Sequence, residues 1–208
     1  MKIAFIGGGQ IAEAIAALAK TAGHDSSFGV RNPRGTVSTT FKRTSFQTAI
    51  EGADLVILAV PWLAVSEVLP PLAGALAGKI VVDTTNAVNA DWSPFPTGDG
   101  SSAAEQIQAL LPNSSVVKAF NTIFADVLRP DRLDRDGLKL TVFVASDDVD
   151  TVQVVMTFVS SIGLAPINAG PLRSARYLEA IAHLNLELAF GQGDGTNTAI
   201  LYHRAQLL

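Results

Sequence analysis

The sequence predicts an α/β fold with a doubly wound, mostly parallel sheet and helices on both faces. Apolar segments of strand length alternate with segments of helical periodicity along most of the chain, an order typical of β-α-β units. Two apolar runs, at residues 54–60 and 79–83, are nearly continuous. Such runs indicate strands that are covered on both faces. Three glycines at residues 7–9 separate the first expected strand from the first expected helix.

The first half of the chain begins with an expected strand at residues 2–6. A helix follows at residues 10–22, where Ile11, Ile15 and Leu18 recur at helical spacing. Gly23 is placed to end that helix in a left-handed conformation. The other elements expected in this half are a strand at 26–31, a short strand or loop within 32–45, a small helix at 46–51, a strand at 54–60, a helix at 64–76 interrupted by Pro70 and Pro71, and a strand at 79–83.

The second half begins with a long loop at residues 87–101, which contains Trp92, two prolines and two glycines. Loops of this length in compact domains are often functional. Ser102 and Glu105 have the spacing of a capping box, so a helix is expected from there to residue 111. The remaining expected elements are strands at 116–120, 140–145 and 164–168, a helix at 148–162, and a helix at 173–190 that is apolar almost all round.

Composition excludes several classes of function. Of the 208 residues, 48% are hydrophobic and 16% are charged, and the net charge is −4. This balance indicates a well-filled core, and without a Lys/Arg run it argues against nucleic-acid binding. The chain has no cysteine and three scattered histidines, so we expect neither disulfides nor a metal site.

The N-terminal apolar run is too short for a secretory signal, because it stops after Ile6. No apolar stretch reaches the roughly 18 residues of a membrane helix. We therefore expect a cytoplasmic protein without membrane segments.

The glycine turn carries the first functional signal. Residues 7–12 read Gly-Gly-Gly-Gln-Ile-Ala, a G-x-G-x-x-A match between a strand and a helix. In this context the glycines permit a tight turn and close approach of a pyrophosphate, which the helix N-terminus attracts. We therefore expect a Rossmann-type dinucleotide site, and the other reading of the pattern is a glycine turn without a ligand.

The residues after the second strand indicate which dinucleotide binds. A site for NAD usually has Asp or Glu there, but this chain has Arg31, Asn32 and Arg34 and no carboxylate between Asp25 and Glu51. A guanidinium pairs well with the 2′-phosphate of NADP. We therefore predict NADP(H), while an exposed loop arginine remains the alternative for Arg31.

Six segments together resemble the NADP oxidoreductases that depend on coenzyme F420, over nearly the whole chain. They are IGGGQIA at 6–12, GVRNP at 29–33, ADLVILAVPW at 53–62, KIVVDTTNAVN at 79–89, VVKAFNTI at 116–123 and GPLRSARYLEAIAHLNL at 170–186. The KAFNT segment is also similar to the reductase domain of membrane metalloreductases, which pass electrons from NADPH to a flavin.

The resemblance implies hydride transfer between NADPH and a small redox acceptor, such as coenzyme F420 or a flavin, and a homodimer. The cofactor residues that we expect are Gly7, Gly9, Gln10, Ile11, Arg31, Asn32, Arg34, Ala59, Val60, Pro61 and Asn86. The acceptor residues that we expect are Trp62, Asn121, Thr122 and Ile123. We treat residues 1–208 as one domain, with a cofactor-binding core at 1–123 and the acceptor and dimer side at 124–208.

No set of catalytic side chains is visible, which suits a reaction whose chemistry lies in the cofactor. Asp147, Asp148 and Asp150 are expected to stabilise a helix start. For His183 we consider a role in the pocket or the dimer interface and, alternatively, a packed or surface position. For Arg173 and Arg176 we consider binding of an acidic tail of the acceptor and, alternatively, a solvated helix face. Two other functions remain open: a sensor that binds NADP(H) without turnover, and a reductase of imines or 3-hydroxy acids. The second usually needs a large helical domain, and its hydroxy-acid type a late lysine, but no lysine follows Lys139.

Overall fold

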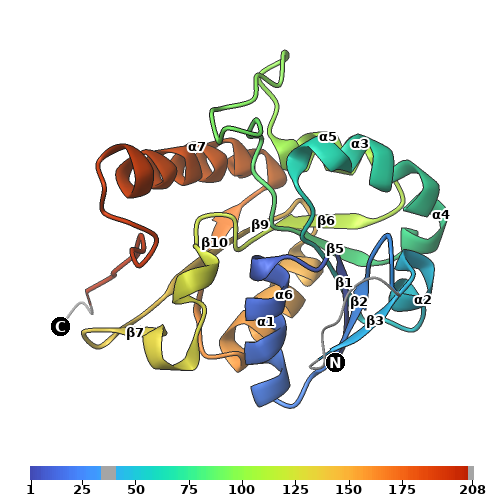
Figure 1. The fold of residues 1–208 in the computed structure, drawn as a ribbon. Helices are drawn as coiled ribbons and strands as arrows, with labels where there is room; N and C mark the ends of the chain where they lie inside the picture. The colour runs from blue at the N-terminus through green and yellow to red at the C-terminus, as the bar shows by residue number, and fades with distance from the viewer. Residues whose placement is uncertain (34–40, 206–208) are drawn as a thin grey trace.

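The computed structural model describes residues 1–33 and 41–205. Within these residues, eight strands form one sheet in the order β10-β9-β6-β5-β4-β1-β2-β3 (Figure 1). The strands are β1 (Lys2–Ile6), β2 (Asp25–Gly29), β3 (Lys42–Thr44), β4 (Leu55–Leu58), β5 (Ile80–Asp83), β6 (Ser115–Lys118), β9 (Thr141–Ala145) and β10 (Ala165–Gly170).

The sheet is mostly parallel, as the sequence predicts. The six strands from β6 to β3 run parallel to one another, while β9 pairs antiparallel with β6 and β10 pairs parallel with β9. Read outward from β1, the six-stranded block has the strand order of a doubly wound Rossmann sheet. The order reverses between β1 and β4, and ligands of such folds bind at the carboxyl ends of the strands there.

Helices cover both faces of the sheet, as predicted (Figure 1). Alternation along β1 decides which side chain meets which layer: Ile3 and Phe5 pack with α1 and α6, while Ala4 and Ile6 face the opposite layer of α2 to α5. The helices are α1 (Gln10–Thr21), α2 (Phe46–Ile50), α3 (Val65–Val68), α4 (Ala73–Leu76), α5 (Ala103–Leu110), α6 (Val149–Ser161) and α7 (Ala175–Leu186).

The local signals at helix ends have the predicted geometry. Gly23 follows α1 with φ +79°. Ser102 and Glu105 make both bonds of the capping box that begins α5. Asp148 caps α6 by accepting a hydrogen bond from the backbone N–H of Thr151. These ends are encoded within a few residues, which is why the sequence predicts them.

Several strand ends differ from their predicted bounds, and one small hairpin was not predicted. The second strand ends at Gly29 and not at residue 31, so Arg31 lies beyond the sheet. The strand expected at 116–120 ends at Lys118, because the chain turns at Phe120, whose φ is +65°. A small hairpin of β7 (Asp134–Arg135) and β8 (Leu138–Lys139) was not expected, because its strands are too short to show alternation.

The late helix is partly buried against the rest of the described chain. Its inward face carries Leu178, Ala182 and two polar residues, Glu179 and Asn185. On another face of the helix, Tyr177 is 73% exposed and Leu184 and Leu188 are also exposed. A π-helical turn, Glu187–Gly191, follows α7.

Candidate functional site

The glycine turn is shaped by the neighbouring strand end. Gly7 has φ +110°, and a Cβ at this position would lie 2.3 Å from the carbonyl oxygen of Ala59, just after β4. Gly9, the residue that precedes α1, has open space where a Cβ would be, and no side chain caps the helix. The first N–H groups of α1 are therefore available to an anion, and the turn leaves room for it.

The chain places Arg31 and Asn32 at exposed positions just after the end of β2. Arg34 lies outside the described residues. A further guanidinium, Arg43 on β3, was missed by the sequence analysis. It stacks over the ring of Phe28, pairs with Glu13 at 2.5 Å and lies close enough to Gly8 to contact a Cβ there. Cationic groups therefore gather on the side of the turn that faces β2 and β3.

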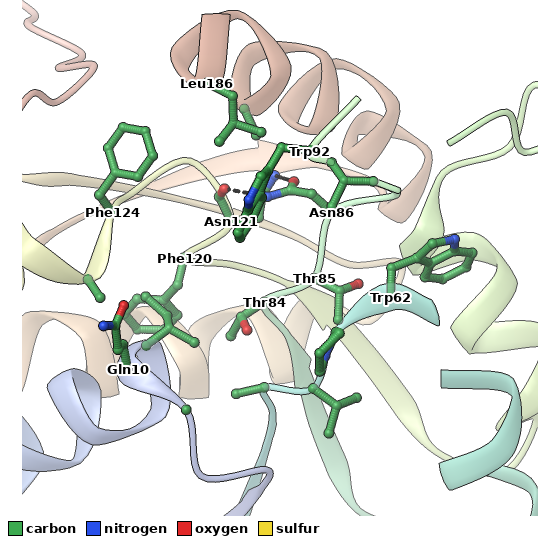
Figure 2. Close-up of a pocket in the computed structure, with 18 of the residues that line it drawn as sticks. Gln10, Trp62, Thr84, Thr85, Asn86, Trp92, Phe120, Asn121, Phe124 and Leu186 are labelled. Atoms are coloured by element: carbon green, nitrogen blue, oxygen red, sulfur yellow. Dashed lines mark hydrogen bonds between the residues drawn. The ribbon is translucent and has the colours of Figure 1, made fainter. Parts of the chain in front are cut away.

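A cavity of about 600 Å³ opens at the switch point between β1 and β4. Figure 2 shows side chains from the first helix, three strand ends and α7 converging on it. The predicted residues that line it are Gly9, Gln10, Ile11, Ala59, Val60, Pro61, Trp62, Asn86, Asn121, Thr122 and Ile123. Gly7 is not among the lining residues. The structure thus brings together segments that are distant in the sequence, whereas Arg31 and Asn32 lie to one side.

Two asparagines form a reciprocal clasp across the cavity floor. The side-chain amide of Asn86 donates to the backbone carbonyl of Asn121 at 2.9 Å, and the Asn121 amide donates back to the Asn86 Oδ1 at 2.9 Å (Figure 2). The Asn121 amide also donates to the carbonyl of Leu178 on α7 at 3.0 Å. Because both partners of this amide are acceptors, its orientation is fixed, and the clasp ties α7 to the sheet.

Two buried polar atoms beside this clasp have no hydrogen-bond partner in the described part of the chain. They are the Oδ1 of Asn121 and the Oγ1 of Thr85, and both residues line the cavity. Thr84, the neighbour of Thr85, is satisfied because its hydroxyl donates to the carbonyl of Leu58 at 3.0 Å. Buried polar groups are rarely left unpaired, so the two free atoms fit a ligand that brings polar groups of its own.

Aromatic side chains form much of the cavity wall. Trp62 packs edge-on against Phe95, with ring centroids 6.2 Å apart. Phe120 and Phe124 lie on the opposite side, and Trp92 reaches the cavity from the loop before α5 (Figure 2). None of the lining residues in the described part of the chain carries a charge. The cavity is therefore suited to a flat, uncharged part of a ligand.

A buried ionic cluster lies beneath the cavity floor and was missed by the sequence analysis. The ammonium of Lys118 contacts Asp83 at 2.8 Å, Glu179 at 2.7 Å and the carbonyl of Thr85 at 2.5 Å. Burial alone would lower the pKa of Lys118, but the two carboxylates raise it above its usual value. The signal was present, because a charged residue ends each of two apolar strands, but nothing local shows that the two charges meet.

The other candidates have structural roles. Asp147 accepts a hydrogen bond from the backbone of Leu172 at 2.9 Å, and Asp148 caps α6. Arg176 makes a two-pronged contact with Glu105, at 2.8 and 2.7 Å. His183 is partly buried but does not line the cavity, and burial lowers its pKa. In the described residues, no group of three or more His, Asp or Glu could hold a metal ion.

The strand order, the glycine turn and the cavity at the switch point define a Rossmann-type protein of the NADP-binding class. Residues 2–87 match the family model described as NADP oxidoreductase, coenzyme F420-dependent. The chain belongs to this family of oxidoreductases.

Relatives of two kinds resemble the chain. The F420-dependent NADP reductase of Methanothermobacter marburgensis is 29% identical over 211 residues, covering 90% of this chain and 92% of the relative. Metalloreductase STEAP3 of Rattus norvegicus is 31% identical over 182 residues, covering 86% of this chain. The chain spans about a third, 36%, of that metalloreductase.

A solved structure is similar over almost the full length. It is a protein of Arthrobacter sp. FB24 described as a candidate F420-dependent NADP reductase, with a TM-score of 0.84, 26% identity, and coverage of 94% of this chain and 96% of that one. Among the described residues of the present chain, no helix has both the length and the apolar character needed to cross a membrane.

Proposed function

We propose that the chain binds NADPH at the glycine turn and the switch-point cavity and transfers hydride to a flavin-type ring such as that of coenzyme F420. The observation that carries the proposal is the continuity of the cavity. It runs from the N-terminus of α1, at Gly9 and Gln10, past the end of β4, to the clasp of Asn86 and Asn121. A dinucleotide needs such a path, with an anion site at one end and a flat site at the other.

The fit to the cofactor rests on three features of this chain. The uncapped start of α1 would hold the pyrophosphate, and the open space beside Gly9 admits it. Arg31 and Asn32, with Arg34, would hold the 2′-phosphate. Ala59, Val60, Pro61 and Asn86 would line the ribose and nicotinamide, because they lie at the strand ends next to the turn.

The residues of the inner cavity position the acceptor. Trp62, Asn121, Thr122 and Ile123 line the cavity and would contact the acceptor ring. When bound, NADPH supplies the hydride, which carries two electrons to the acceptor ring, and the acceptor takes up one proton from water. The protein supplies the position of the two rings and an apolar enclosure, so no charged side chain is required in the lining.

The exposed face of α7 is proposed to pair with a second copy of the chain. Tyr177 and Leu184, on α7, are large apolar residues that are 73% and 55% exposed, and Leu188, in the turn that continues this face, is 37% exposed. Exposed apolar residues grouped on one helix mark interaction surfaces. The opposite face of α7 supplies Ala182 and Asn185 to the cavity wall, so pairing would brace that wall. Light scattering should give twice the chain mass for the wild type and the chain mass for Leu184→Glu.

The decisive experiment is NADPH oxidation by the purified protein with coenzyme F420, FMN, FAD and ferric chelates in parallel. The proposal expects turnover with at least one ring acceptor and tighter binding of NADPH than NADH. If the protein binds NADPH tightly but reduces none of the acceptors, it is a sensor that binds NADP(H) without turnover and not a reductase. Absence of NADPH binding would reject both.

A further inference from the structure

Trp92 has an unusual position for a large apolar side chain. It lies in the loop between β5 and α5, it is 61% exposed, and it lines the mouth of the cavity (Figure 2). In the described chain none of the close ring contacts involves Trp92, whereas Trp62 packs on Phe95 and Phe120 packs on Phe158. Packing within the chain therefore accounts for the other cavity aromatics but not for Trp92.

The backbone at Trp92 is held in a conformation that is unfavourable for a bulky residue. Its φ is +67°, in the left-handed region, where glycine and asparagine are the usual residues. Among the described non-glycine residues with positive φ, Trp92 and Phe120 both line the cavity, and the remaining one is Asp136. Strained residues of this kind concentrate at ligand sites, where the surrounding structure must enforce them.

A compact set of hydrogen bonds enforces the conformation. Asn89 donates through its backbone to the carbonyl of Ser93 at 2.8 Å and through its side chain to the Ser93 hydroxyl at 3.0 Å. Asp91 accepts from the N–H and hydroxyl of Ser93, and a β-bridge joins Val88 and Pro94. These contacts hold the backbone from which the indole of Trp92 projects.

The chemistry of the lining defines what the indole would meet. Among the described residues of the lining, the polar side chains are amides, hydroxyls and the indoles of Trp62 and Trp92, and none is charged. The Oδ1 of Asn121, a residue of the lining, has no hydrogen-bond partner in the described residues and can accept from an N–H donor. A planar, uncharged ring whose edge carries N–H and C=O groups satisfies both demands, and aromatic faces stack on indole.

We infer that Trp92 binds the face of the hydride acceptor's ring and selects planar rings over small, non-planar acceptors. This inference rests on the proposed function and deepens it, because it assigns the acceptor class to one side chain. Trp92 is not needed for NADPH, which binds from the glycine turn at the other end of the cavity.

Direct binding tests the inference without turnover. The fluorescence of FMN or F420 is titrated with the NADP⁺ complex of the wild type, Trp92→Ala, Trp92→Phe and Tyr202→Ala. Tyr202 is a matched control, since it is 49% exposed, packs on Phe143 and lies outside the cavity. Loss of one stacked ring should weaken acceptor binding about tenfold in Trp92→Ala. Trp92→Phe should keep most of the affinity, and Tyr202→Ala all of it.

Steady-state kinetics provide the second readout. The KM for FMN or F420 should rise in Trp92→Ala while the KM for NADPH changes less than about twofold, and ferric-chelate reduction should not fall. The inference would be overturned if Trp92→Ala bound the acceptor as tightly as the wild type. It would also be overturned if Trp92→Ala lost as much affinity for NADPH as for the acceptor. If Trp92→Ala does not fold, the acceptor affinities of Trp92→Phe and Trp92→Leu are compared instead. Tighter binding by Trp92→Phe supports the inference, and equal affinities overturn it. A wild type that binds no ring acceptor rejects the proposed function itself, which is a distinct result.

Discussion

The ammonium of Lys118 and the carboxylate of Asp83 lie 2.8 Å apart, and both side chains are completely buried. The two residues are register partners at the carboxyl ends of β6 and β5. Glu179 joins them from α7, and its carboxylate also accepts hydrogen bonds from the backbone N–H groups of Ala103 and Ala104. The cluster therefore connects the sheet, the start of α5 and the helix that walls the cavity.

Replacing Lys118 with Met should destabilise the protein by about 3–5 kcal/mol, because two buried carboxylates lose their cation. Chemical denaturation at pH 7 measures the loss. The matched variant Lys118→Met/Asp83→Asn/Glu179→Gln should recover much of it, since no buried charge remains. An equal loss in the single and triple variants would show that packing, and not charge, holds this site.

The same cluster has a defined pH dependence. The pKa of Lys118 is raised in the folded protein, so its stabilisation is complete at neutral pH, below the ordinary value of 10.5. This stabilisation is lost only when the pH rises through the pKa that Lys118 has in the folded protein. The cluster should therefore not contribute to unfolding at neutral or mildly alkaline pH.

The parts of the fold that the sequence predicts are those encoded over a few residues. The glycine turn, the capping box at Ser102 and the apolar strands each have a local signature. Lys118 and Asp83 are 35 residues apart in the chain, and only strand pairing makes them neighbours. Arg43 was missed for the same reason, since β3 lies in a Ser/Thr-rich stretch and exists through its pairing with β2.

Gly7 and Gly9 should respond differently to alanine. At Gly7, a Cβ would meet the Ala59 carbonyl at 2.3 Å and the φ of +110° is strained for alanine. Gly7→Ala should therefore lower the unfolding free energy by more than about 2 kcal/mol. At Gly9 the space is open, so Gly9→Ala should cost about 1 kcal/mol or less but weaken NADPH binding. Thermal unfolding and NADPH titration of both variants separate the two effects.

Arg31→Glu should invert the preference between the two nicotinamide cofactors. The exposed guanidinium would be replaced by a carboxylate that repels the 2′-phosphate and can accept from a ribose hydroxyl. The ratio of NADPH to NADH affinity should fall by roughly tenfold or more, since hydrogen bonds to charged groups contribute about 1.5–3 kcal/mol. Arg129→Glu, an exposed arginine paired with Asp131, is the control. An unchanged ratio of NADPH to NADH affinity would show that Arg31 does not contact the cofactor.

Glu105 should contribute to acid sensitivity. Its pKa is lowered to about 2, first by the hydrogen bonds from Arg176 and further by those from Ser102. A depressed folded pKa stabilises the protein above the ordinary value of 4.5, and this stabilisation is lost as the pH falls toward 2. Glu105→Ala should cost about 1 kcal/mol at pH 7, a typical value for a helix cap. The difference from wild type should shrink between pH 4.5 and 2 in urea unfolding, and a constant difference would contradict the assignment.

Thr85 offers the sharpest separation of binding from folding. Its buried hydroxyl has no partner within the described residues, so Thr85→Val should not lower the unfolding free energy of the ligand-free protein. Thr84→Val is the matched control, because it removes a hydrogen bond to Leu58 and should cost about 1 kcal/mol. If a ligand satisfies Thr85, NADP⁺ or FMN should bind about three- to tenfold more weakly to Thr85→Val. Unchanged binding of both ligands, or a stability loss equal to that of Thr84→Val, would show that the hydroxyl has another partner.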